Sequence, residues 1–154
     1  MKILKMTIST KPLEILLVED NKGDIGLITE FFSDAKVITN IHIAEDREEA
    51  IRFLYDKDKF LGSTLPDIII LDLNLPKKDG REVLKTIKEN KDLKIIPVII
   101  LTTSSAEKDI LRVYDLHANA YLIKPLDFDE FTKVIKSITD FWFKAVTLPP
   151  KNSH

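Results

Sequence analysis

The chain contains no cysteine, only 4 glycines and no long apolar run. Without cysteine it can form no disulfide framework, no thiolate nucleophile and no thiolate metal site. Gly23 and Gly26 are too few and wrongly placed for a glycine-rich loop that cradles nucleotide phosphates, so we do not expect the protein to use ATP itself. No stretch approaches the roughly 18 uninterrupted apolar residues of a membrane-spanning helix. Thiol-dependent, nucleotide-binding and membrane-spanning proteins are therefore excluded as starting hypotheses.

An excess of charge of either sign is also missing. The 23 lysines and arginines nearly balance the 25 aspartates and glutamates, which gives a net charge of −2. Nucleic-acid binding normally needs a concentrated basic excess, so we expect no nucleic-acid partner. The segment from Met1 to Met6 is too short and too interrupted for a secretory signal. We expect no membrane partner and a cytoplasmic protein.

The length of 154 residues suits a single domain with a proper hydrophobic core. We divide the chain into an N-terminal lead over residues 1–12, a folded domain over 13–142 and a C-terminal tail over 143–154. The tail is too short for a DNA-binding output domain, so any output is expected to pass through protein contacts.

Five short apolar runs alternate with stretches of helical periodicity. Such runs, bounded by turn residues, are typical of strands buried on both faces of a parallel sheet. The predicted strands span residues 14–18, 41–44, 67–71, 97–101 and 120–123. Five β-then-α units without an internal repeat predict an α/β doubly wound sandwich, with a parallel five-stranded sheet in the order 2-1-3-4-5. The polar stretch 55–66 is predicted to be a loop.

Three helices carry a recognisable start. A capping residue followed three positions later by glutamate is typical of a helix N-terminus. Such pairs follow the second, fourth and fifth strands: Asp46 with Glu49, Ser104 with Glu107, and Asp127 with Glu130.

Charged residues stand directly after three of the predicted strands. The first strand ends at Glu19 and Asp20, the third at Asp72, and the fifth at Lys124. The carboxyl ends of parallel strands meet at one edge, where ligands bind. Each close carboxylate pair there would repel by roughly 4 kcal/mol at ~4 Å, so the cluster needs a cation. Oxygen ligands of this kind suit Mg²⁺ completed by a phosphate oxygen, and the lysine would neutralise a second phosphoryl oxygen.

These residues together resemble the receiver domain of two-component response regulators. The resemblance covers residues 14–142, and it rests on five signals in register with their strands: Glu19-Asp20, Asp72 followed by Leu73-Asn74-Leu75-Pro76 and Asp79-Gly80, Thr102, Tyr121, and Lys124-Pro125. It implies a flavodoxin-like (CheY-like) fold. It also implies a signalling protein, not a metabolic enzyme, which catalyses its own phosphorylation from a phosphodonor and its own dephosphorylation.

The resemblance implies a role for each site residue. Asp72 would be the phosphoacceptor, and Glu19, Asp20, Asp72 and the backbone carbonyl of Asn74 would hold Mg²⁺. Positioning and charge neutralisation would do most of the catalysis.

The remaining residues would bind the phosphoryl group and act as a switch. Lys124 and the Thr102 hydroxyl would each bind a phosphoryl oxygen. Movement of Thr102 would let Tyr121 rotate and so change the surface of the fourth helix, fifth strand and fifth helix. The family also commonly has a cis bond between this lysine and Pro125.

Further features resemble one subfamily of receivers. His117 stands where most receivers have glycine, and the run 72–84 and the tail from Phe141 to Pro150 are similar to single-domain regulators such as that of cyanobacterial phytochrome. The likeness implies a sensor histidine kinase of phytochrome type as partner. It also implies a homodimer through the fourth helix, fifth strand, fifth helix and tail. The alternative is that the apolar tail folds back on its own domain.

Two other functions are open at this point. A phosphohydrolase with an aspartyl-phosphate intermediate is disfavoured, because haloacid-dehalogenase-type enzymes need a second aspartate two residues after the first, where Asn74 stands. A receiver fold that has lost phosphorylation is opposed by Asp72 and Lys124. Only Thr103, where many receivers have alanine or glycine, mildly favours it.

Overall fold

The computed structural model describes residues 11–55 and 65–150, and within them lies one five-stranded sheet. The strands are β1 (Leu13–Val18), β2 (Thr39–Ala44), β3 (Ile68–Leu71), β4 (Val98–Thr102) and β5 (Ala120–Ile123). All are parallel and lie in the order β2-β1-β3-β4-β5, which confirms the predicted fold and strand order. Most of the predicted lead over residues 1–12, most of the predicted loop and the end of the tail lie outside the described residues.

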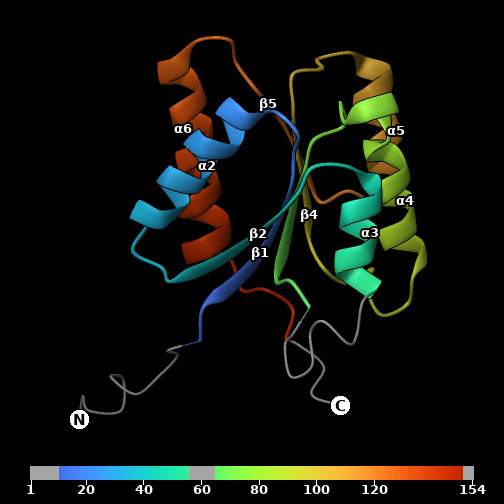
Figure 1. Cartoon of the computed structure of the whole chain (residues 1–154), viewed down its shortest axis with the longest axis horizontal. Helices are drawn as coiled ribbons and strands as arrows, with labels where there is room; N and C mark the ends of the chain where they lie inside the picture. The colour runs from blue at the N-terminus through green and yellow to red at the C-terminus, as the bar shows by residue number, and fades with distance from the viewer. Residues whose placement is uncertain (1–10, 56–64, 151–154) are drawn as a thin grey trace.

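Helices cover both faces of the sheet. They are α2 (Lys22–Asp34), α3 (Arg47–Tyr55), α4 (Gly80–Glu89), α5 (Glu107–Asp115) and α6 (Phe128–Ile138), with short helical turns η1 (Pro76–Lys78) and η2 (Thr139–Ala145). Figure 1 shows α2 and α6 on one side of the sheet and α3, α4 and α5 on the other. The chain is therefore a three-layer sandwich.

The two faces of the sheet bury separate cores. Alternate strand residues point to opposite faces, so Leu16, Ile69 and Ile100 join the core under α3, α4 and α5. Their neighbours Leu17 and Ile70 join the core under α2 and α6. This double burial explains why the strands are continuous apolar runs and do not alternate between apolar and polar residues.

Two of the three predicted helix starts are confirmed. The Glu49 amide donates to the Asp46 side chain over 2.8 Å, and the Glu130 amide donates to the Asp127 side chain over 3.0 Å. The third is wrong, because α5 begins at Glu107 with Ala106 as its cap. The Ser104 hydroxyl instead donates to the Asp109 carboxylate over 2.6 Å, and Ser104 does not cap α5.

Two backbone details distinguish this chain. His117 has a φ of 72°, a left-handed conformation in which glycine carries no steric penalty. That conformation explains why glycine is usual at this position in the family that the chain resembles.

The Lys124–Pro125 bond is trans, contrary to the family-based expectation. Trans is the ordinary preference of a bond to proline.

The first part of the tail continues from α6. The boundary predicted between residues 142 and 143 falls inside η2. The ring of Phe143 meets that of Phe32 edge-on, with 4.8 Å between ring centroids, and Trp142 and Leu148 pack against the same core. The segment as far as Leu148 therefore contacts its own domain.

Candidate functional site

The backbone ladder of the sheet continues past the strand ends and fixes the predicted site residues. The Glu19 amide donates to Ala44 over 2.9 Å, and the Asp72 amide donates to Val18 over 3.0 Å. The Lys124 amide donates to the Thr102 carbonyl over 2.7 Å. Glu19, Asp72 and Lys124 therefore lie at the same edge of the sheet, as predicted, and the backbone amide of each is hydrogen-bonded to a neighbouring strand.

Three carboxylates gather at this edge. Glu19, Asp20 and Asp72 each have an oxygen within 4.8 Å of the others. Glu19 and Asp72 are buried, with 1% and 5% of their surface exposed. Burial, and then the charge of Asp72, raise the pKa of Glu19 to about 7. Hard oxygen donors this close together fit a divalent cation such as Mg²⁺, which would relieve the repulsion.

Lys124 neutralises part of this charge. Its ammonium lies 2.5 Å from Glu19 Oε1, 2.8 Å from Asp24 Oδ2 and 3.0 Å from Asp72 Oδ2. Burial lowers the pKa of Lys124, but hydrogen bonds to Asp24 and Glu19 outweigh it and hold that pKa above its usual value. Asp24, in the first turn of α2, was not predicted from the sequence.

Asn74 joins the phosphoacceptor candidate to two threonines. Its backbone amide donates to Asp72 Oδ1 over 3.0 Å. Its side-chain amide donates to the hydroxyls of Thr102 and Thr103, over 3.2 and 3.0 Å. Thr102 is fully buried, whereas Thr103 is exposed. The Thr102 hydroxyl is therefore linked to Asp72 through Asn74.

Tyr121 lies on the same face of the sheet as Thr102. Its register partner on β4 is Ile100, two residues before the threonine. The Tyr121 hydroxyl donates to the Ser104 carbonyl over 2.9 Å, which ties the ring to the turn between β4 and α5. The two predicted switch residues are thus connected through the β4 backbone and this turn.

A charged pair stabilises that turn. Asp109 accepts a hydrogen bond from the Ser104 hydroxyl and pairs with the Arg81 guanidinium. These two hydrogen bonds, in that order of importance, lower the pKa of Asp109. Arg81 is the second residue of α4, so the pair connects the helix after Asp72 to the turn that holds Tyr121. No motif in the sequence indicated this contact.

Known proteins are similar to this chain in both sequence and fold. The family model described as "Response regulator receiver domain" matches residues 15–136. The chain belongs to the response regulator receiver family. It is thus a response regulator, a signalling protein of two-component systems, as its resemblance to receivers predicted.

Individual receivers resemble it along nearly their whole length. The response regulator Rcp1 of Synechocystis sp. is 45% identical over 141 residues, which cover 92% of this chain and 96% of Rcp1. The crystal structure of Mn²⁺-bound Rcp1 superposes with a TM-score of 0.85 at 45% identity, covering 90% of this chain and 100% of that one. The phosphorylated cyanobacterial phytochrome response regulator RcpA gives a TM-score of 0.85 at 44% identity, covering 91% and 100%.

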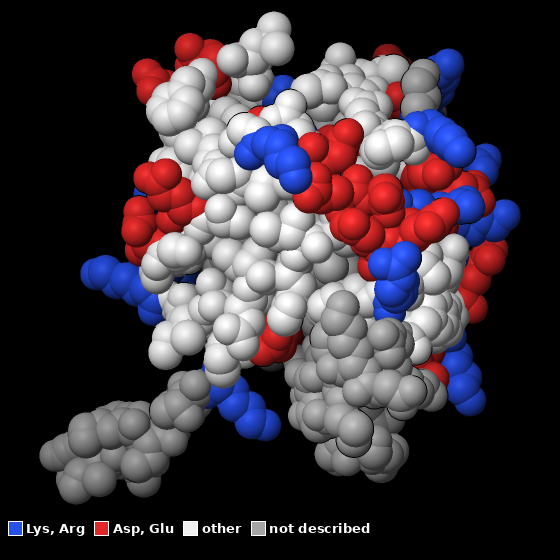
Figure 2. All heavy atoms as spheres, viewed as in Figure 1, with Lys and Arg blue, Asp and Glu red and all other residues white. Residues whose placement is uncertain are grey.

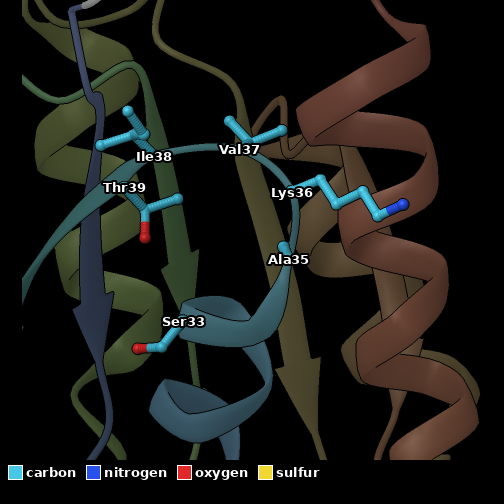
Figure 3. Close-up of a pocket in the computed structure, with 6 residues that line it drawn as sticks. All are labelled: Ser33, Ala35, Lys36, Val37, Ile38 and Thr39. Atoms are coloured by element: carbon cyan, nitrogen blue, oxygen red, sulfur yellow. The ribbon is translucent and has the colours of Figure 1, made fainter.

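Two hollows flank α2, one near each end. The larger, of about 670 Å³, opens beside Lys124 and is lined in part by Asn21, Thr103 and Phe128. The smaller, of about 320 Å³, lies at the end of α2 and the turn into β2 and is lined by Ser33, Ala35, Lys36, Val37, Ile38 and Thr39 (Figure 3). Lys36 is its one charged lining residue, so only the larger hollow belongs to the receiver site.

The start of α4 is packed directly on the backbone of Asp72 and Leu73. A Cβ atom on Gly80 would lie 2.4 Å from the Asp72 carbonyl oxygen and 2.5 Å from Leu73 Cα. Because backbone must move, Gly80→Ala is expected to destabilise the protein by about 3 kcal/mol in urea unfolding. Gly26→Ala is the control, because nothing lies within 4 Å of its added methyl group. It should be neutral or stabilising, and equal effects would contradict the packing argument.

Proposed function

We propose that this receiver accepts a phosphoryl group on Asp72 from the phosphohistidine of a sensor histidine kinase. The observation that carries the proposal is a buried Asp72 whose Oδ2 lies 3.0 Å from Lys124, next to Glu19 and Asp20. A carboxylate oxygen attacks phosphorus, the bond from phosphorus to the imidazole nitrogen breaks, and that nitrogen keeps the electron pair. Covalent capture of this kind is an established use of a carboxylate.

Divalent metal is part of this proposal. Glu19, Asp20, Asp72 and the backbone carbonyl of Asn74 would hold Mg²⁺, which supplies neutralising charge during transfer. The Lys124 ammonium orients the Asp72 carboxylate before transfer and binds a phosphoryl oxygen afterwards. The Mn²⁺-bound form of the relative Rcp1 supports the binding of a divalent metal. The same groups would serve the self-catalysed phosphorylation and dephosphorylation.

Phosphorylation is proposed to change the surface of α5, β5 and α6. The Thr102 hydroxyl, which accepts a hydrogen bond from Asn74, would turn to donate its own O–H to a phosphoryl oxygen, because a charged acceptor makes a strong hydrogen bond. Tyr121 shares a sheet face with Thr102 and would then move from its bond to Ser104. The result is a two-state switch biased by a local change of charge.

The names of the relatives suggest the pathway. RcpA is a phytochrome response regulator, so we place this chain in a phytochrome-type pathway, in the cytoplasm, with a histidine kinase as donor.

No helix in the described part of the chain is long and apolar enough to cross a membrane. On the face shown in Figure 2, acidic side chains group at the upper right and basic ones are scattered without forming a band. The described part of this face therefore has no basic band of the kind that nucleic-acid binding uses.

The test of phosphorylation is intact mass after incubation with acetyl phosphate, with Mg²⁺ or with EDTA. We expect a single phosphoryl adduct that requires Mg²⁺. A folded protein that forms no adduct and binds no beryllofluoride would instead support a receiver that has lost phosphorylation. Steady release of phosphate from phosphate esters would support the hydrolase alternative.

We also propose a homodimer through α5, β5, α6 and the tail. Apolar side chains are exposed there, including Leu111 at 69%, Tyr114 at 47%, Ile123 at 42% and Phe141 at 53%. Apolar area of this kind usually marks an interface. Light scattering should give a dimer mass that Leu111→Lys shifts toward the monomer. Ile38→Lys, on the turn before β2, is the control, and a monomer mass at every wild-type concentration would rule the dimer out.

A further inference from the structure

Asp24 is placed over Lys124 by the cap of α2. The Asn21 side chain accepts a hydrogen bond from the Asp24 amide over 3.0 Å, which makes Asp24 the third residue of the helix. Its carboxylate then lies 2.8 Å from the Lys124 ammonium. The contact joins the first turn of a helix to the end of β5 across 100 residues of sequence.

Lys124 has no spare donor in this arrangement. An ammonium has three N–H donors, and those of Lys124 face Glu19, Asp24 and Asp72. A phosphoryl oxygen can therefore be bound by Lys124 only if one of these carboxylates gives up its hydrogen bond. The identity of the partner that leaves determines how the site changes on phosphorylation.

Asp24 is the partner that can leave at least cost. Its side chain is 26% exposed, whereas those of Glu19 and Asp72 are 2% and 6% exposed. A released Asp24 carboxylate can be hydrated, but a released Glu19 carboxylate would be a buried, unpaired charge. Glu19 and Asp72 are also the proposed metal ligands, whereas Asp24 is outside that set.

We propose that Asp24 is a positioning residue that holds Lys124 in the unphosphorylated protein and competes with the incoming phosphoryl group for it. This inference rests on the proposed phosphorylation of Asp72. Replacing the competing carboxylate by a neutral amide weakens the hold on one donor of Lys124, because the hydrogen bond is no longer charge-assisted. Asp24→Asn should therefore be phosphorylated faster than wild type by acetyl phosphate at saturating Mg²⁺, by about fivefold, a typical size for coupling between two groups.

A helix-capping role alone would give a different result. An acid in the first turn stabilises a helix through its dipole, whatever lies beyond it. Glu130 is the matched case, because it is the third residue of α6 and its amide donates to the cap Asp127 over 3.0 Å. Its carboxylate pairs with Lys133, and both side chains are exposed. Glu130→Gln thus removes a first-turn charge without touching Lys124.

The experiment follows adduct formation by intact mass for wild type, Asp24→Asn and Glu130→Gln, with urea unfolding of each. We expect faster phosphorylation of Asp24→Asn only, and the acceleration should persist near 1 M salt, where the Debye length is about 3 Å. Equal rates in all three proteins, or an acceleration that salt abolishes, would overturn the inference in favour of capping or of simple repulsion of the phosphodonor. A wild type that forms no adduct would instead contradict the proposed function.

Discussion

Asp72→Asn is expected to abolish the phosphoryl adduct while leaving the fold intact. Asparagine has the same shape but no carboxylate, so it cannot attack phosphorus. Its single side-chain oxygen can still accept from one of the two donors that Asp72 contacts over 3.0 Å each, the Asn74 amide at Oδ1 or Lys124 at Oδ2. Intact mass after acetyl phosphate and Mg²⁺ measures the loss directly.

The same variant tests the electrostatics of the site. The charge of Asp72 is the second cause, after burial, of the raised pKa of Glu19. Removing that charge should lower the titration midpoint of Glu19 below the value of about 7 in wild type, as carboxyl-carbon NMR would show. A midpoint that stays near 7 would mean that the charge of Asp72 does not contribute to the raised pKa of Glu19.

A control for Asp72→Asn comes from the opposite end of β3. Asp67 directly precedes β3, and its carboxylate accepts a hydrogen bond from the Glu14 amide over 2.8 Å. Asp67→Asn should retain the adduct, because its side chain belongs to the amino end of the sheet. An adduct that persists in Asp72→Asn would show that another residue accepts the phosphoryl group.

The strand-end part of this site could be predicted from sequence because one rule governs it. Apolar runs give the strands, and parallel strands bring their carboxyl ends to one edge. Glu19, Asp72 and Lys124 therefore come together whatever the loops do. The position of Asp24 obeys no such rule, because it depends on how the first turn of α2 sits above β5. Asn21 and Asp24 together form an ordinary helix start, and nothing in that pattern indicates a partner.

Competing local interactions limited other predictions. Ser104 and Glu107 have the spacing of a capping box, yet the serine bonds to Asp109, which is already held by Arg81 from another helix. A pattern within one segment cannot reveal a partner from elsewhere in the chain. The apolar tail posed the same difficulty. Phe143 is packed on Phe32 whereas Phe141 is 53% exposed, so one segment contributes both to the core and to the surface.

Lys124→Ala should be among the most destabilising substitutions in the metal-free protein. It leaves the buried carboxylates of Glu19 and Asp72 without their shared cation, and removing one partner of a buried ion pair typically costs about 3–5 kcal/mol. Urea unfolding in EDTA measures this loss. Lys133→Ala is the control and should change stability little, because its pair with Glu130 is exposed to solvent.

The loss of stability in Lys124→Ala should depend on pH and on Mg²⁺. Without Lys124 the pKa of Glu19 rises further above its ordinary value of 4.5. A carboxyl whose pKa is raised by folding stabilises the folded state at low pH, and that contribution is lost as pH rises through the folded pKa. The penalty of the substitution should therefore be smaller at pH 5 than at pH 8. Mg²⁺, which binds the folded acidic site, should restore part of it.

Lys124→Ala should also separate phosphorylation from the change at α5, β5 and α6 that follows it. Asp72 and the acidic pair are still present, so Lys124→Ala should form the Mg²⁺-dependent adduct, though the phosphoryl group loses its ammonium contact. The change at α5, β5 and α6, followed by amide NMR shifts on adding beryllofluoride, should then be largely absent. A full set of shifts in Lys124→Ala would mean that Thr102 and Tyr121 transmit the change without the lysine, and that its role is confined to neutralising the acidic residues.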